Sequence, residues 1–323
     1  MTGDAAWVLP AIVSPAIYAA VSIGDKILLS RSGLPIRSMY LFVGLVQLVV
    51  AAVVLIALGF PAAPAASLLA AYGGGFVWGL ALYGMFTAIQ REEISRVTPV
   101  WQSSPIFAAI LAVLFLGESV TWAGWLAILL VVGGAASISI RRGALGTGYV
   151  LSPVFWMLVA AACLVGVAQL LLKIGSEELG VWHNMALRGI GLYCALGLQF
   201  TRREHLRSLA SFLGRGRSGM GLLLSEGAGP ITGNFFLLLA LQNGPVSLVS
   251  ALLGTRPIFV LAGTLLMAVV AKGMLDDRLG RSDVLLKAAS TCAVVGGIII
   301  ISFSGLPLDD LVAQRRIAAP ETV

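Results

Sequence analysis

The polar residues of this chain divide it into long, almost uniformly apolar segments. A helix needs about 20 mostly apolar residues to cross a bilayer, and segments near this length recur along the chain. The pattern predicts an all-α integral membrane protein, because an open sheet would leave its edges unsatisfied in lipid. The ten expected helices are 8–29, 37–58, 67–89, 97–116, 121–140, 152–173, 181–200, 219–241, 246–270 and 284–303.

Two of these segments contain a proline in nearly the same sequence context. Pro105 and Pro257 each begin a Pro-Ile-Phe triplet, and their positions differ by 257 − 105 = 152 residues. Proline interrupts the hydrogen bonding of a helix backbone, so both segments are predicted to be broken at corresponding depths. Interrupted helices at matching positions in two halves of a chain indicate the central site of a transporter.

Other matches extend the relation between the two halves. Val132-Gly133-Gly134 corresponds to Val295-Gly296-Gly297, and Lys26 is echoed by Lys173. We therefore predict a five-helix repeat over residues 1–143, a second over 144–305 with an insertion around Lys272–Asp283, and an exposed tail over 306–323. Because each repeat has an odd number of helices, the second is expected to be inserted upside down relative to the first.

Composition and charge narrow the class of protein. The chain is 59% hydrophobic and only 11% charged, which excludes an ordinary soluble enzyme. Its net charge of +6 comes from basic clusters between the apolar segments. Such clusters indicate topology and contact with anionic lipid rather than nucleic-acid binding. We expect a multi-pass protein of the cell (inner) membrane.

The basic clusters also bear on orientation. They follow the first, third, fifth, seventh and ninth segments, whereas the other connections carry almost no positive charge. The positive-inside rule then places the odd-numbered connections in the cytoplasm and both termini outside.

Several short motifs occur in the same order in a known family. They are the proline followed two residues later by an aromatic residue, the Leu116-Gly117-Glu118 turn, Ala240-Leu241-Gln242-Asn243-Gly244-Pro245, and the glycine pair near the end of each half. In these features the chain resembles the EamA-type branch of the drug/metabolite transporter superfamily. The resemblance implies a ten-helix inverted repeat, alternating access, and a central cavity lined mainly by helices 1, 3, 4, 6, 8 and 9.

The chain departs from this family in two respects. It reads Leu275-Asp276-Asp277-Arg278-Leu279-Gly280 where the family would show a second Gly-Glu turn. Typical members also keep both termini in the cytoplasm, which is opposite to the orientation that the loop charges favour. The orientation therefore stays open at this point.

Ionisable side chains within apolar segments are costly in lipid and indicate function. Arg256 lies near the middle of its segment, immediately before Pro257. It is either a cationic anchor for an anionic group of a substrate, such as a carboxylate, or a partner in an internal ion pair. Arg188 lies about two turns from its expected helix start, so snorkelling or structural pairing is favoured over substrate contact.

One face of the eighth segment is polar. Glu226, Pro230, Gly233 and Asn234 recur at helical spacing, so they are expected to lie on one side. Glu226 either exchanges a proton during transport or forms a fixed salt bridge with Arg256 or Arg188. Gly229 and Gly233 of the eighth segment, like Gly75 and Gly79 of the third, favour close backbone packing.

The remaining candidate substrate contacts are uncharged. Trp101 and Gln102 lie one turn before Pro105, where an indole can stack on substrate and an amide can hydrogen-bond it, although Trp101 also fits an aromatic belt at the membrane surface. Further candidates from the third, sixth and first segments are Trp78, Tyr83, Gln169 and Tyr18.

No catalytic constellation accompanies these residues. His183 and His205 are the two histidines, neither lies in a cluster with metal-ligand spacing, and no phosphate-binding loop occurs. We expect no cofactor, metal or enzymatic activity. We predict a secondary transporter of a small organic metabolite, and export is favoured over import. A lipid or lipid-linked precursor flippase and a non-transporting membrane assembly protein remain alternatives, and both a monomer and a homodimer are compatible with the sequence.

Overall fold

The described part of the chain forms helices and their connections. The computed structural model describes residues 6–32, 35–92, 97, 100–139 and 152–270, together with residues 289, 292, 293, 295–297 and 300. The expected insertion at Lys272–Asp283 and the tail at 306–323 lie outside these residues. Within the tenth expected segment, 284–303, the described residues are helical.

The helices of the first half begin and end close to the predicted boundaries. They are α1 (Val8–Ser32), α2 (Ile36–Leu58), α3 (Ala65–Ile89), α5 (Ser104–Leu116) and α6 (Trp122–Ser139). Glycine ends two of them, because Gly59 and Gly117 have φ of 78° and 66°, values that residues with a Cβ rarely adopt.

The second half contains α8 (Pro153–Glu178), α9 (Val181–Leu192), η1 (Tyr193–Gly197), η2 (Leu198–Phe200), α10 (Arg203–Leu213), α11 (Arg217–Leu222), η3 (Leu223–Ala228), α12 (Gly229–Asn243), α13 (Val246–Leu253) and α14 (Arg256–Val270). Helix α8 begins at a sequence-encoded cap, where Ser152 Oγ accepts a hydrogen bond from the Phe155 amide at 3.2 Å. The seventh and eighth predicted segments are continuous but change locally to π-helix at η1 and η3.

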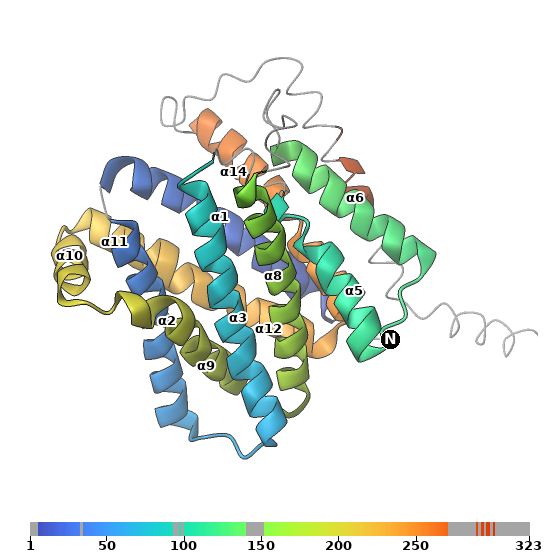
Figure 1. Cartoon of the computed structure of the whole chain (residues 1–323). Helices are drawn as coiled ribbons and strands as arrows, with labels where there is room; N and C mark the ends of the chain where they lie inside the picture. The colour runs from blue at the N-terminus through green and yellow to red at the C-terminus, as the bar shows by residue number, and fades with distance from the viewer. Residues whose placement is uncertain are drawn as a thin grey trace, which may run out of the picture.

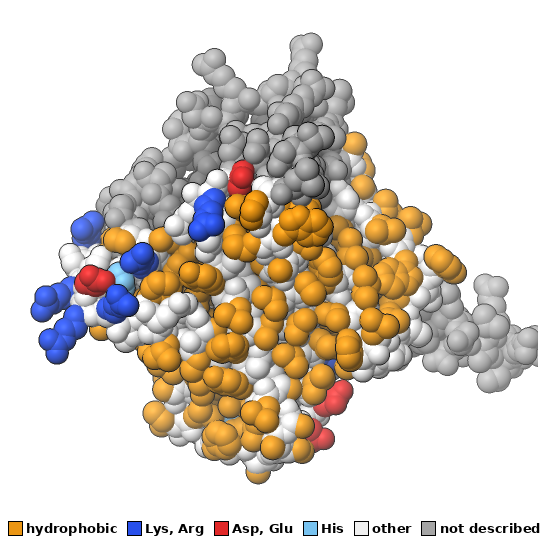
Figure 2. Space-filling model, in the orientation of Figure 1, with side chains coloured by type: hydrophobic (Ala, Val, Ile, Leu, Met, Phe, Trp, Pro, Cys, Tyr) orange, Lys and Arg blue, Asp and Glu red, His pale blue; other side chains and the backbone are white. Residues whose placement is uncertain are grey.

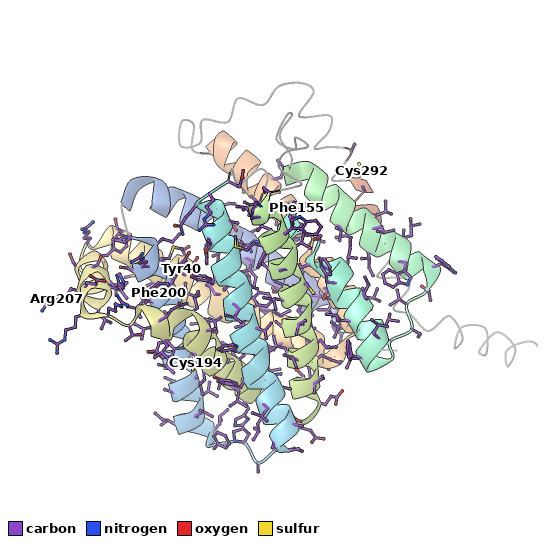
Figure 3. The ribbon with its side chains drawn as sticks, in the orientation of Figure 1. Tyr40, Phe155, Cys194, Phe200, Arg207 and Cys292 are labelled. Atoms are coloured by element: carbon purple, nitrogen blue, oxygen red, sulfur yellow. The ribbon has the colours of Figure 1, made fainter. Side chains whose placement is uncertain are left out.

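Helix α10 was not predicted, because its sequence was interpreted as a basic connection. It is too short and too charged to cross a membrane, yet it is amphipathic. Leu209 and Phe212 are buried against Met39 and Phe42 of α2, whereas Arg207 projects away from the bundle (Figure 3). The periodic apolar positions therefore fasten α10 to the bundle and leave its arginines exposed.

The helices of the two halves pack against one another. Helix α3 packs on α8, α1 on α12, α2 on α9, and α5 on α13, so each of these pairs joins the first half to the second. Figure 1 shows α3 and α8 side by side at the front, with α12 behind them. The two halves thus share one interior.

The face of the bundle seen in Figure 2 is apolar over most of its height. Large apolar side chains are strongly exposed, including Ile56 at 86% and Trp122 at 90%. Five helices in the described residues are long and apolar enough to cross a membrane: Ile36–Leu58, Ala65–Ile89, Pro153–Glu178, Ser218–Asn243 and Val246–Gly263. An exposed apolar surface this extensive is unfavourable in water but suits lipid, so the structure fits a multi-pass membrane protein.

Two charged side chains hold the turn between α12 and α13. Glu118 accepts hydrogen bonds at the start of α13, from Val246 N at 2.6 Å and Ser247 N at 3.1 Å. Lys173 donates to the last carbonyls of α12 and to the turn, at 2.8 Å from Leu241 O and 3.0 Å from Gly244 O. Each charge lies at the helix end that its sign favours, because the helix dipole is positive at the N-terminus and negative at the C-terminus.

Candidate functional site

Both proline-containing helices are interrupted immediately before their prolines. Gln102 and Ser103 form a turn before α5, and Gly254 and Thr255 separate α13 from α14. Each proline is the second residue of the helix that follows, where its missing N–H costs no helical hydrogen bond. Gln102 Nε2 donates to Gly254 O at 3.4 Å, so the two breaks lie against each other.

Tyr18 of α1 stands at the centre of a polar cluster beside these breaks. Its hydroxyl donates to Asn234 Oδ1 of α12 at 2.6 Å. The guanidinium of Arg256 lies over the Tyr18 ring, 5.4 Å from its centroid. Arg256 Nε also donates to Ser22 Oγ, one turn further along α1, at 3.1 Å. The structure thus brings together three predicted site residues, Tyr18 of α1, Asn234 of α12 and Arg256 of α14.

Glycine makes this approach of α1 and α12 possible. A Cβ built on Gly233 would lie 2.9 Å from Tyr18 Cε2, which is closer than side chains pack. Ser14 Oγ donates to the Gly233 carbonyl at 2.9 Å, which fixes the same crossing. The glycine pair of the eighth segment therefore packs its helix on α1, while Gly75 and Gly79 of α3 pack against α9 and η1.

Arg188 of α9 lies in the same region and does not snorkel, which was one of the two predicted alternatives; structural pairing stays a prediction. Its exposed fraction is 1%, so its head group does not reach the bundle surface. The guanidinium lies over the Trp78 ring of α3, 5.3 Å from the centroid. Its Nε and Nη1 are buried without a hydrogen-bond partner in the described part of the chain. Sequence reasoning undervalued Arg188 because distance from a helix end does not reveal what covers a side chain.

Glu226 lies on the π-helical segment η3 and is half-buried. Glu226, Arg188 and Arg256 each interact electrostatically with Tyr18. The proposed alternative of a salt bridge between Glu226 and Arg188 does not occur in the structure. A π-helical turn leaves the regular backbone ladder and is frequent at functional sites. Nothing in the apolar pattern marked this local change of helix type.

The other predicted residues occupy different positions. Gln169 is 3% exposed and accepts a hydrogen bond from Ser250 Oγ of α13. Gln102 is buried at the helix break, and Trp101 is half-buried one residue before it. Tyr83 does not join the cluster: it is 42% exposed and packs edge-on against Tyr40 at a centroid distance of 6.3 Å. Tyr40 lies near Phe200 beside α10 (Figure 3).

The chemistry available here is that of binding. Among the residues that the structure describes, no three His, Cys, Asp or Glu side chains gather as metal ligands. The cluster offers two guanidinium groups, a phenol, an amide and a carboxylate, flanked by the Trp78 ring. Such a set can hold a small polar molecule by charge, hydrogen bonds and stacking.

Comparisons with known proteins agree with this architecture. Residues 5–140 match the family model described as the EamA-like transporter family. A solved structure described only as "Crystal structure of protein" is 16% identical, covers 99% of this chain and 100% of its own, and superposes with a TM-score of 0.66. That likeness shows the fold over both halves. No curated protein sequence matches the chain.

Proposed function

We propose that the chain, whose residues 5–140 match the EamA-like transporter family, is a secondary transporter of this kind and exports a small organic metabolite bearing an anionic group. The observation that carries the proposal is the cluster around Tyr18, where Arg256 and Asn234 from the second half meet α1 from the first. Binding between two halves suits alternating access, because movement of one half against the other opens the site to either side.

The proposed roles follow from position. Arg256, Tyr18 and Asn234 contact the substrate, with Trp78 and the Gln102 amide beside them, and Glu226 provides charge or proton coupling from the π-helical segment. Gln169 supports α13 through Ser250. Pro105 and Pro257 mark the two helix breaks at the centre. Trp101 and Tyr83 remain candidates outside the cluster.

We further propose two inverted repeats, 1–143 and 144–305. Packing supports this division. If each helix is replaced by its counterpart in the other half, the α3–α8 pair becomes the α12–α1 pair, and the structure contains both pairs. Gln102 also bonds Gly254, its own counterpart at a separation of 152 residues.

Orientation follows from the charges at the two ends of the bundle. The end that bears α10 is rich in exposed arginines, whereas the exposed Glu177 and Glu178 lie at the other. We place the α10 end in the cytoplasm. In a background without the native cysteines, Glu178→Cys is expected to react with a membrane-impermeant maleimide in intact cells, while Arg207→Cys reacts only after lysis. The reverse labelling would contradict this orientation.

Flux measurements test the transport proposal. In proteoliposomes, Arg256→Ala is expected to reduce uptake of a transported anionic metabolite at least about tenfold, because about 1.4 kcal/mol of charge-assisted binding is lost. Glu226→Gln is expected to abolish dependence of that flux on a pH gradient. Arg207→Ala, an exposed arginine on α10, is the matched control and should leave flux unchanged.

Unchanged flux in both Arg256→Ala and Glu226→Gln, with the proteins folded, would contradict these roles. The same vesicles address the flippase alternative: movement of fluorescent lipid between leaflets, without metabolite uptake, would replace the proposed function. Absence of both activities in well-folded protein would favour a membrane assembly protein.

A further inference from the structure

Arg188 is buried where its positive charge is energetically unfavourable unless a ligand binds it. Its side chain is 1% exposed, and two of its nitrogens have no hydrogen-bond acceptor among the described residues. No carboxylate in the described part of the chain forms an ion pair with it either. A buried charge that lacks a partner is strongly unfavourable, so a purely structural role does not account for its placement.

The fold nevertheless positions this arginine closely. A Cβ on Gly75 would overlap the Arg188 carbonyl oxygen and lie 2.7 Å from its Cα, so α3 and α9 touch backbone to backbone at this residue. Trp78, one turn along α3 from Gly75, lies under the guanidinium at 5.3 Å. A guanidinium supported on one face by an aromatic ring keeps its N–H edge for hydrogen bonding.

Arg188 also belongs to the region between the two halves. Helix α9, which carries Arg188, packs on α12, and Asn234 of α12 accepts a hydrogen bond from the Tyr18 hydroxyl of α1. The Arg256 guanidinium lies over the Tyr18 ring, and the charges of Arg188 and Arg256 both act on this phenol. With Glu226 ionised, the three charged side chains still sum to one positive charge, which a singly charged anion would neutralise.

We propose that Arg188 is the principal anion-binding group of the site and that it takes the carboxylate of an organic acid through its planar N–H edge. The inference deepens the proposed transport function and rests on it for the substrate, but the binding itself can be measured without transport. A carboxylate fits because its two oxygens accept two parallel N–H bonds from one guanidinium. Arg256 then supplies the second cation from the other half.

Thermal unfolding of the full-length purified protein tests the assignment. Benzoate is the probe, benzamide is its uncharged counterpart, and inorganic phosphate is the alternative oxyanion. Benzoate, but not benzamide, is expected to raise the unfolding temperature of the wild type by about 3 °C or more at concentrations well above its Kd. Arg188→Lys should weaken the benzoate shift, because lysine lacks the planar fork. A larger shift with phosphate than with benzoate would overturn the carboxylate assignment.

Arg188→Met separates binding from structural support. This variant fills similar space without charge, so it is expected to unfold at a higher temperature than the wild type in anion-free buffer and to lose the benzoate shift. The control, Arg207→Met, should keep the shift. A less stable Arg188→Met protein, or one that retains the full benzoate shift, would overturn the proposal.

Flux measurements distinguish failure of the Arg188 assignment from failure of the proposed transport function. Transport of only neutral or cationic metabolites, with no benzoate shift, would refute the role of Arg188 and leave transport intact. A benzoate shift that depends on Arg188, in protein that moves no metabolite, would sustain the anion site and refute transport.

Discussion

Replacing Gly75 by alanine is expected to cost about 3 kcal/mol or more of stability, enough to reduce the yield of folded protein sharply. The added methyl group would overlap the carbonyl oxygen of Arg188 and lie 2.6 Å from its carbonyl carbon. Both contacts are with backbone, so no rotamer change relieves them, and α3 and α9 must move apart. Thermal unfolding and size-exclusion profiles in detergent measure the effect.

Gly73→Ala provides a control two residues away on the same helix. The nearest atom to a Cβ at Gly73 is Leu171 Cδ1 at 3.7 Å, an ordinary packing distance. Alanine also favours helix over glycine by about 1 kcal/mol, so this variant should be as stable as the wild type or slightly more stable. Equal stability of the Gly75→Ala and Gly73→Ala proteins would contradict the backbone contact between α3 and α9.

Glu118→Ala is expected to lower stability by about 2–3 kcal/mol, the second largest effect. Its carboxylate accepts bonds from the Val246 and Ser247 amides and from Ser247 Oγ at 2.7 Å. These amides begin α13 and have no partner within the helix, so removal of the carboxylate leaves them and the hydroxyl unsatisfied. The variant should unfold at lower temperature in detergent.

Glu178→Ala tests whether loss of any carboxylate gives the same result. Glu178 is an exposed acidic residue at the end of α8, and its removal should change the unfolding temperature by less than the experimental error. If Glu118→Ala behaved like Glu178→Ala, the cap on α13 would contribute little, and the Leu116-Gly117-Glu118 turn would need another explanation.

The apolar pattern determined much of the architecture. It located α2, α3 and α8 within a few residues of their observed boundaries, because lipid demands long, uninterrupted apolar helices. The prolines gave the positions of two breaks, since proline removes a backbone donor wherever it falls. The same reasoning failed for α10, whose amphipathic period is visible only when a partner for its apolar side is considered.

Only some of the site residues could be predicted from the sequence. Arg256, Tyr18 and Asn234 were selected because polar groups in apolar segments are costly, and the structure brings them into contact. The distance of Arg188 from the end of its helix did not reveal that its side chain is buried. Tyr83 was also selected, although it lies outside the cluster. The role of Glu118 at the start of α13 was equally hidden, since its partners lie more than a hundred residues away.

The sequence by itself determined where helices form, where two of them break and which polar residues lie at membrane depth. These properties depend on local backbone chemistry and on transfer of side chains into lipid. Only the tertiary structure decided which of those residues meet. Gly75 and Gly233 allow helices to approach until backbone and ring are in contact, and that approach places Arg188 over Trp78 and Arg256 over Tyr18.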